Sequence, residues 1–231
     1  MITTVLIDYD GTLHDWDSVL TRSLDGILGL KGSELLRIWI FDIHRAIVHA
    51  RHMDKHDDMM FHCELLFQHL GRPFEKRNAD LICRRFEEAG VKAMDDPIYF
   101  PDAIPALDEL KKMGLKLCLS TGMHAERKAE TLARTTGNDY FDHVFSEHTI
   151  GYFKTEPKYY RIALEWSDSK PEHTVSVGDT PLSDIRPAKL TGIRTIWLNR
   201  RGEPKPAVED QRPDREAADL LQAVEIIQNW M

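Results

Sequence analysis

The chain opens with a short apolar run that ends in two acidic residues. Residues 3–7, Thr-Thr-Val-Leu-Ile, are followed by Asp8 and Asp10 and then by Gly11-Thr12. A mostly β-branched or apolar run predicts a buried strand, and the glycine after the acids predicts a tight turn. In open α/β sheets, ligands bind outside the carboxyl ends of the strands. A solvated turn after an edge strand is the alternative interpretation, and later strand ends decide between the two.

Other apolar runs also end in polar residues. Leu115–Ser120 precedes Thr121, and Thr174–Gly178 precedes Asp179 and Asp184. Two more strands are predicted at 143–145 and 194–198, and helical patterns separate the strands at 106–113, 125–135, 158–166 and 182–190. Strands that alternate with helices predict a doubly wound α/β fold, in which helices cover both faces of a parallel sheet.

In their order along the chain, these segments resemble the four motifs of the haloacid dehalogenase-like (HAD) superfamily. The matching residues are Asp8-Tyr9-Asp10-Gly11-Thr12-Leu13, Thr121-Gly122, Lys154, and Gly178-Asp179 with Asp184. The resemblance covers roughly residues 1–14 and 99–200. It implies a Rossmann-like core, a mobile cap and a magnesium-dependent phosphatase activity.

The chemistry of each motif residue can be stated beside this resemblance. We assign Asp8 as the nucleophile that forms an aspartyl-phosphate. Asp10 is expected to protonate the leaving alkoxide and then to deprotonate the attacking water. Thr121 offers a hydroxyl to the phosphoryl group, and Lys154 offers a positive charge. The small residues beside these groups are expected to contact substrate: Gly11, Thr12 and Gly122.

Carboxylates that converge at one sheet edge require a cation. Two carboxylates ~4 Å apart repel each other by roughly 4 kcal/mol at an effective dielectric constant near 20. Ligation by carboxylate oxygens and substrate phosphate is the pattern that Mg²⁺ prefers. We therefore expect Mg²⁺ as the cofactor, with Asp8 and Asp179 as ligands and Asp184 as a water-mediated or orienting partner. The resemblance also makes the backbone carbonyl of Asp10 a metal ligand.

Several of these residues have a plainer interpretation. Lys154 alone fits a solvated lysine, Thr121 fits a helix cap, and Ser120 could exchange roles with Thr121. Asp184 lies early in a predicted helix, where the helix dipole alone favours an acid. Asp10, by contrast, supports the functional interpretation, because dehalogenases and phosphonate-cleaving members of the superfamily lack an acid at this position. Asp10 therefore favours phosphoryl transfer.

A long insertion without any strand signal follows the first motif. Its helical patterns lie near residues 18–30, 33–52, 55–70 and 74–94. We predict a smaller, all-helical cap domain of residues 15–97, inserted into a core domain of residues 1–14 and 98–231. A helical insertion at this place resembles the HAD cap that closes over small substrates and excludes water.

Basic and histidine side chains are concentrated in residues 44–56 of this otherwise acidic chain. One interpretation is a patch that faces a second acidic group of the substrate, with Arg51 helping to set substrate choice. A solvated helix face is the alternative. His49 and His52 are spaced i, i+3, as in a zinc pair, but no Cys or acidic partner at a recognised ligand spacing accompanies them.

Charge and composition narrow the range of partners. The net charge of −8 argues against nucleic-acid binding, which depends on neutralising phosphates. The sequence has no membrane-length apolar run, and we expect no signal peptide, because the first residues already form the first predicted strand. The three cysteines have unrelated spacings that fit reduced thiols. We expect a cytoplasmic monomer or homodimer whose partner is a small phosphorylated metabolite.

Three functions follow from these observations. The leading prediction is a magnesium-dependent phosphatase acting on a small phosphomonoester. The alternative is a phosphomutase acting on a sugar phosphate, which would use the same aspartyl-phosphate. The third is a non-catalytic binding module, because a fold resemblance alone does not establish activity.

Overall fold

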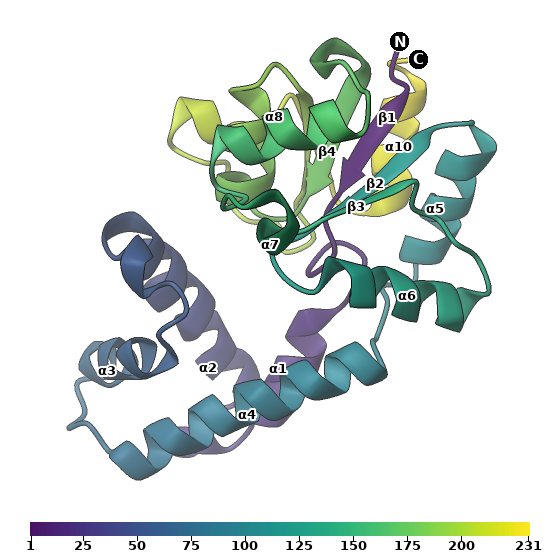
Figure 1. The fold of residues 1–231 in the computed structure, drawn as a ribbon. Helices are drawn as coiled ribbons and strands as arrows, with labels where there is room; N and C mark the ends of the chain where they lie inside the picture. The colour runs from purple at the N-terminus through teal and green to yellow at the C-terminus, as the bar shows by residue number, and fades with distance from the viewer. The chain divides into compact units, whose positions relative to one another are not determined.

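The computed structural model describes residues 1–231. It divides into two compact units, one of Met1–Asp15 with Tyr99–Met231 and the other of Trp16–Ile98. The first unit, the core, contains the sheet, whereas the second unit is helical (Figure 1). No helix is both long and apolar enough to cross a membrane.

The core is built around a six-stranded sheet in the order β3-β2-β1-β4-β5-β6. The strands are β1 (Thr4–Ile7), β2 (Lys116–Ser120), β3 (His143–Phe145), β4 (Thr174–Gly178), β5 (Arg194–Leu198) and β6 (Arg215–Ala217). Every pairing is parallel, and Val5 of β1 lies between Leu117 of β2 and Val175 of β4. The strand order reverses beside β1, which is where ligands bind in Rossmann-like sheets. The predicted α/β fold class is confirmed.

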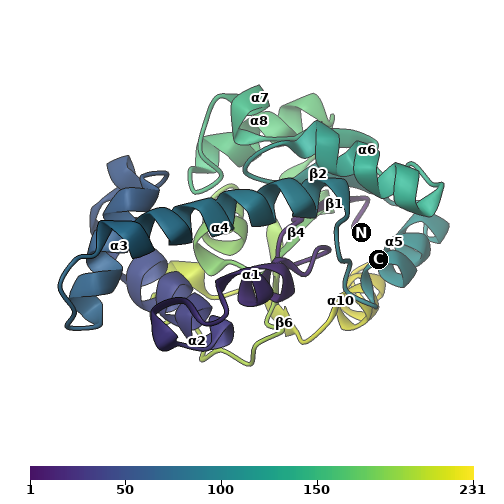
Figure 2. The same cartoon turned by 90° about the horizontal axis from the view of Figure 1, so that it is seen from below.

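Helices cover both faces of this sheet, because successive side chains of a strand point to opposite faces. Val5 and Ile7 belong to one buried cluster, which includes residues of α5 (Ala103–Lys112), α6 (Ala125–Thr136) and α10 (Leu220–Gln228). Leu6 points the other way, into a cluster with α7 (Glu147–Ile150), α8 (Pro157–Trp166) and α9 (Arg186–Lys189). Figures 1 and 2 show α5 and α10 side by side on their face.

Some core elements differ from the sequence prediction. Strand β6 was not predicted, because Arg215-Glu216-Ala217 has no apolar pattern. The predicted helix 182–190 is instead the π-helix η5 (Pro181–Ile185) followed by α9, and Pro187 lies at the start of α9, where its missing N–H is tolerated. The remaining short 3₁₀ elements of the core are η4 (Pro171–His173) and η6 (Glu209–Gln211).

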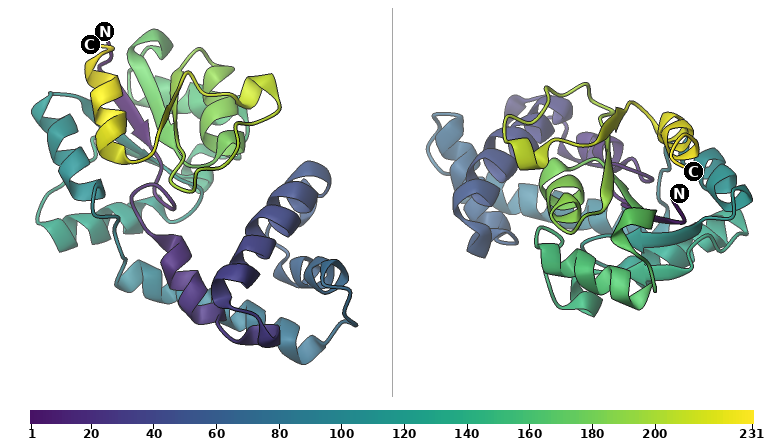
Figure 3. Two further views of the ribbon diagram at one scale, coloured as in Figure 1. Left: turned by 180° about the vertical axis from the view of Figure 1, so that it is seen from behind. Right: turned by 90° about the horizontal axis from the view of Figure 1, so that it is seen from above.

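The helical unit has its own apolar interior. Its elements are α1 (Trp16–Leu24), η1 (Ile27–Gly29), α2 (Gly32–Arg37), η2 (Ile38–His49), η3 (Met53–Lys55), α3 (Met59–His69) and α4 (Lys76–Asp95). Helix α1 packs against α2 and α4 (Figure 3), around buried side chains such as Leu20, Leu35 and Ile82. The segment predicted as one helix, 33–52, begins as α2 and continues as the π-helix η2.

Candidate active site

The turn after β1 carries the first acidic pair to the carboxyl edge of the sheet. The backbone N–H of Asp8 still donates to Val177 of the neighbouring strand, over 2.9 Å, so the position of Asp8 is fixed by the sheet. The chain then closes a tight turn, in which the N–H groups of Leu13 and His14 donate to the carbonyl of Tyr9. Gly11 adopts φ +78°, a conformation that favours glycine.

A buried lysine, Lys154, pairs with two acids from different motifs, Asp8 and Asp184. Lys154 Nζ lies 2.6 Å from Asp8 Oδ1 and 2.5 Å from Asp184 Oδ1, and all three side chains are buried. The backbone N–H of Lys154 donates to Glu147 Oε1 over 2.8 Å, which fixes the loop after β3. Burial opposes the charge of Lys154, but Asp184 and Asp8 outweigh it and raise its pKa well above the ordinary value. Lys154 is therefore a permanent buried cation.

Three carboxylates meet beside this lysine, and we call Asp8, Asp179 and Asp184 the carboxylate cluster. One oxygen from each lies within 4.8 Å of the others, and all three residues are buried. Burial raises the pKa of Asp8 to about 7; Lys154 opposes this rise, and Asp184 and Asp179 add to it. Burial likewise raises the pKa of Asp184. The positive charge of Lys154 therefore does not fully neutralise the negative charge of the carboxylate cluster.

The donor set of the carboxylate cluster fits Mg²⁺. All its donors are oxygens, which suit a hard divalent cation, and a cation would relieve the repulsion among them. The side chain of Asp179 also contacts Thr180 Oγ1 at 2.9 Å and Arg201 Nη1 at 3.1 Å. Asp184 Oδ2 accepts the N–H of Thr180 over 2.8 Å, so Asp184 is held inside rather than at a solvated helix end.

Asp10 lies in a different set of contacts. Its Oδ1 lies 2.9 Å from His14 Nδ1, and its Oδ2 lies 2.6 Å from Lys128 Nζ. Burial raises the pKa of Asp10, but the charge of Lys128 and the hydrogen bonds from His14 and Lys128 outweigh it and lower the pKa. Asp10 is thus ionised in the resting site, and its carboxylate is not part of the carboxylate cluster. Its expected metal contact involves only the backbone carbonyl.

Thr121 and Ser120 point to different neighbours. Thr121 Oγ1 accepts from Lys128 Nζ at 3.0 Å, which connects it to Asp10, whereas Ser120 Oγ donates to Tyr159 Oη at 3.3 Å. Both residues are buried. The structure therefore brings Thr121, rather than Ser120, beside the acids at the end of β1.

The residues predicted to contact substrate lie in three different environments. Thr12 Oγ1 is buried without a hydrogen-bond partner, so it is a free polar atom next to the turn. The carbonyl of Gly122 accepts the N–H of Glu147 over 2.9 Å, which joins the β2 end to α7. Arg51 belongs to the helical unit and is exposed, and its role in substrate binding stays a prediction.

Sequence reasoning missed three basic or histidine residues of this region: His14, Lys128 and Arg201. His14 is four residues after Asp10, and that spacing was the available signal. Lys128 lies within the helix that follows Thr121, with its Nζ 5.1 Å from the ring centroid of Tyr9. Arg201 follows β5 and had no sequence signal, because only the strand order brings it to Asp179.

A further missed residue, Arg200, supports the turn from behind. Its guanidinium makes two hydrogen bonds to Asp102, at 2.8 and 3.1 Å, and donates to the carbonyl of Thr12 at 2.8 Å. Asp102 also accepts the N–H of Leu220 over 2.7 Å. The Arg200–Asp102 pair therefore ties the turn after β1 to the starts of α5 and α10.

Comparison with known proteins now decides the family. The family model of the haloacid dehalogenase-like hydrolases matches residues 2–192. The chain belongs to the haloacid dehalogenase-like hydrolases. The family resemblance of the four motifs is thereby confirmed. In this hydrolase the acids and the lysine of those motifs lie together at one edge of the sheet.

Relatives of this HAD hydrolase include named phosphatases. It is 32% identical over 124 residues to a phosphoserine phosphatase of Thermus thermophilus, covering 54% of this chain and 49% of the relative. It is 33% identical over 130 residues to a glyceraldehyde 3-phosphate phosphatase of Methanocaldococcus jannaschii, covering 56% and 57%. The chain thus spans about half the length of these two relatives.

Solved structures extend the likeness to the whole HAD hydrolase chain. An L-2-haloacid dehalogenase superposes with a TM-score of 0.72, over 98% of this chain and 99% of that chain, at 23% identity. At this identity the likeness shows the fold alone. The structural neighbour therefore supports the architecture and leaves the reaction to be argued from the site.

Proposed function

We propose that this HAD hydrolase is a magnesium-dependent phosphatase that hydrolyses a small phosphomonoester through an aspartyl-phosphate. The observation that carries the proposal is the pairing of buried Asp8 with Lys154, beside Asp179 and Asp184. A phosphate monoester is anionic, so an anionic nucleophile needs neighbouring positive charge to approach it. The names of the two phosphatase relatives support the same reaction class.

Asp8 begins the reaction. One of its carboxylate oxygens forms a bond to phosphorus as the bond from phosphorus to the ester oxygen breaks. Lys154 lies 2.6 Å from Asp8 Oδ1 and can neutralise negative charge on both the carboxylate and the phosphoryl group. When bound, Mg²⁺ held by Asp8, Asp179 and Asp184 supplies further positive charge for the phosphoryl oxygens.

Asp10 moves the protons in both halves of the reaction. The bound phosphate brings negative charge towards Asp10 and thereby raises its pKa, so the carboxylate takes a proton from solvent before transfer. The departing alkoxide accepts that proton. The ionised Asp10 then takes a proton from the water that attacks the aspartyl-phosphate, which releases phosphate and restores Asp8. In the resting site His14 and Lys128 hold the Asp10 carboxylate in place.

The Asp10 contacts argue against dehalogenation, despite the likeness of the fold to an L-2-haloacid dehalogenase. A departing halide needs no proton, so a built acid–base group at this position would have no task. Asp10 is instead held by two partners, His14 and Lys128. Halide release from 2-chloropropionate should therefore be absent in the wild-type protein, whereas phosphate release should be measurable.

Turnover of para-nitrophenyl phosphate with Mg²⁺ and with EDTA tests the proposal. We expect turnover only with Mg²⁺, and a screen of phosphorylated metabolites should then find a preferred substrate. A non-catalytic module would be silent under both conditions. The alternative phosphomutase would yield an isomerised sugar phosphate rather than stoichiometric free phosphate, so product analysis distinguishes it.

A further inference from the structure

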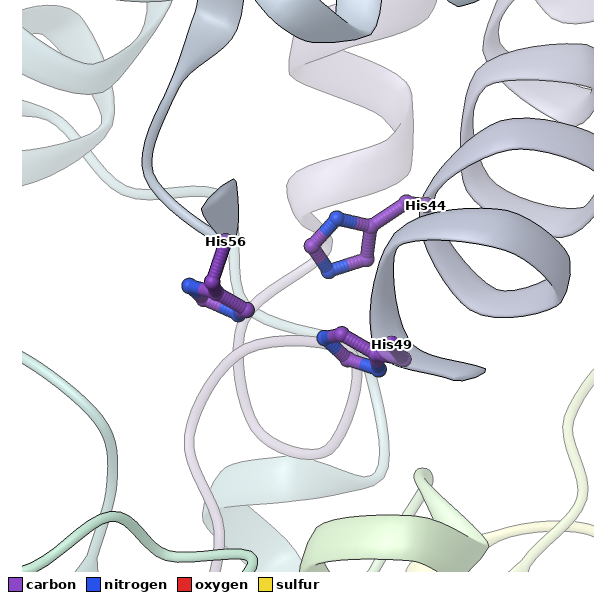
Figure 4. Close-up of side chains that lie close together, drawn as sticks. All are labelled: His44, His49 and His56. Atoms are coloured by element: carbon purple, nitrogen blue, oxygen red, sulfur yellow. The ribbon is translucent and has the colours of Figure 1, made fainter. Parts of the chain in front are cut away.

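Three histidines of the helical unit form a second group of potential metal ligands. His44 and His49 belong to η2, and His56 follows η3 directly. One ring nitrogen of each lies within 4.8 Å of the others, and the rings face a common centre (Figure 4). We call these three residues the histidine cluster. His52, which the sequence suggested as a partner for His49, instead packs edge-on against Phe61.

The π-helical backbone of η2 makes this meeting possible. Residues five apart in an α-helix point about 140° away from each other around the axis, because one turn takes 3.6 residues. A π-helix has i→i+5 hydrogen bonds, so residues five apart are neighbours on one face. His44 and His49 are five apart, and their ring centroids are 4.1 Å from each other. π-helical segments occur frequently at functional sites.

Hydrogen bonds fix the tautomer of His44. His62 Nδ1 lies 2.8 Å from the carbonyl of Asp58, which can only accept, so this nitrogen carries the proton. The other nitrogen of neutral His62 is then an acceptor, and it lies 2.9 Å from His44 Nδ1. His44 Nδ1 therefore donates, and its lone pair is on Nε2. A ligating histidine normally has its second nitrogen engaged in this way.

His56 has a comparable outer partner. Its Nδ1 lies 2.8 Å from Asp57 Oδ1. The carboxylate therefore orients the ring and leaves the lone pair of Nε2 for a metal ion. A carboxylate behind a ligating histidine is a recurring outer-shell arrangement in zinc sites. Two of the three rings are thus held with a lone pair available for a metal.

His49 supplies the unsatisfied member of the histidine cluster. Both of its ring nitrogens are buried from solvent, and neither has a hydrogen-bond partner. A buried polar atom without a partner is unfavourable, so such an atom in a folded protein calls for an explanation. A metal ion held between the three rings would give one nitrogen of His49 the partner that it lacks. Neutral imidazole is the form that binds metal ions.

We propose that His44, His49 and His56 form a zinc site within the helical unit, with a fourth position for water or an anion. Three imidazoles with an open position are an established zinc ligand set. Tetrahedral coordination at about 2.0–2.1 Å places the nitrogens roughly 3.3 Å apart, so small side-chain rotations close the group around the metal. The bound zinc joins η2 to the loop before α3.

Zinc titration of the full chain tests this proposal. The protein is purified without a histidine tag and stripped of metal, and ZnCl₂ is titrated against a chromogenic chelator in excess MgCl₂, which competes for the carboxylate cluster. We expect one equivalent of zinc that disappears in His49→Gln, with Kd raised more than about 100-fold. Removing an outer partner should raise Kd about 10- to 100-fold, in both His62→Gln and Asp57→Asn.

His52→Gln is the matched control, because it removes a histidine from the same segment but outside the cluster. It should bind zinc as the wild-type protein does. Circular dichroism of each zinc-free variant checks that the fold is kept, and His56→Gln provides a second ligand variant at a less buried position. X-ray absorption of the zinc complex should show about three imidazole nitrogens at about 2.0–2.1 Å.

Two results would overturn the zinc site. One is equal zinc affinity and stoichiometry in the wild-type protein, His49→Gln and His56→Gln. The other is a zinc environment of oxygen ligands only. Neither readout involves phosphatase turnover, so the zinc site and the proposed function fail or stand separately.

Discussion

The carboxylate cluster and the histidine cluster gather donors in opposite ways. Asp8 lies far in sequence from Asp179 and Asp184, and it meets them because β1 and β4 are neighbours in the sheet. The histidines come from 13 consecutive residues: the π-helical pitch of η2 brings His44 and His49 together, and the chain after η3 adds His56. The carboxylate cluster offers charged oxygen donors, which are hard ligands, whereas the histidine cluster offers neutral nitrogen donors, which are borderline ligands. The comparison teaches that one chain can present two sets of donor atoms, each suited to a different class of metal ion.

The largest expected effect comes from removing the nucleophile in Asp8→Asn. Turnover should fall by roughly 10³-fold or more, because no other side chain replaces the lost carboxylate oxygen. The measurement is kcat on the preferred phosphomonoester, with circular dichroism to show that the fold persists. Zinc uptake by the histidine cluster should be unchanged. Near wild-type turnover would remove Asp8 from its assigned role.

Asp10→Asn should lower turnover by about 10²-fold, because both proton transfers lose their carrier. Stopped-flow and steady-state rates with leaving groups of different basicity separate the two steps. A good leaving group needs little protonation, so its first step should be affected least. Equal loss for all leaving groups would contradict the role of Asp10 in alkoxide protonation.

Thermal melts with Mg²⁺ and with Zn²⁺ test whether the two clusters bind different metals independently. A metal at a hundredfold excess over its Kd stabilises the folded state by ~2.7 kcal/mol. Asp179→Asn should lose the Mg²⁺-dependent rise in Tm and keep the zinc-dependent rise, whereas His49→Gln should show the reverse. If either variant loses both responses, the two clusters are not independent sites.

The smallest expected effect concerns support of the turn after β1. Burial raises the pKa of Asp102, but hydrogen bonds from Arg200 and from the N–H of Leu220 outweigh it, so the pKa is lowered. This contribution to stability is present above the ordinary pKa of 3.8 and is lost as pH falls through the lowered value. Asp102→Asn should therefore cost about 1–2 kcal/mol at neutral pH and less in acid.

Urea unfolding of wild type and Asp102→Asn at several pH values measures this difference. Lys112→Ala, which removes an exposed partner of Glu109, is the control and should change stability little. A difference that does not shrink as the pH falls would show that Asp102 acts through packing alone.

The sequence predicted the parts of this protein that depend on local patterns. Apolar runs marked β1, β2 and β4, and their polar ends identified Asp8, Asp179 and Thr121. It did not predict His14, Lys128 or Arg201 as neighbours of the acids, because those pairings arise only when separate elements pack together. Strand β6 escaped notice since three residues carry too little pattern.

The helical unit shows a second limit of sequence reasoning. The apolar spacing within residues 33–52 predicted an α-helix, and Leu36 and Ile43 of this segment are buried. The same spacing assumed 3.6 residues per turn, which separates His44 from His49. Pitch depends on packing and on hydrogen bonding across several turns, so the sequence marked the histidine-rich segment 44–56 but did not predict which of its histidines meet.

Two glycines have a consequence for how this chain can change over generations. A methyl group at Gly178 would come within 2.3 Å of Asp184, and one at Gly11 within 2.5 Å of Asp179. Even the mildest replacement at either position would displace a carboxylate that the reaction needs. Random mutagenesis with selection for turnover should therefore return glycine at both positions, although neither glycine carries a reactive atom.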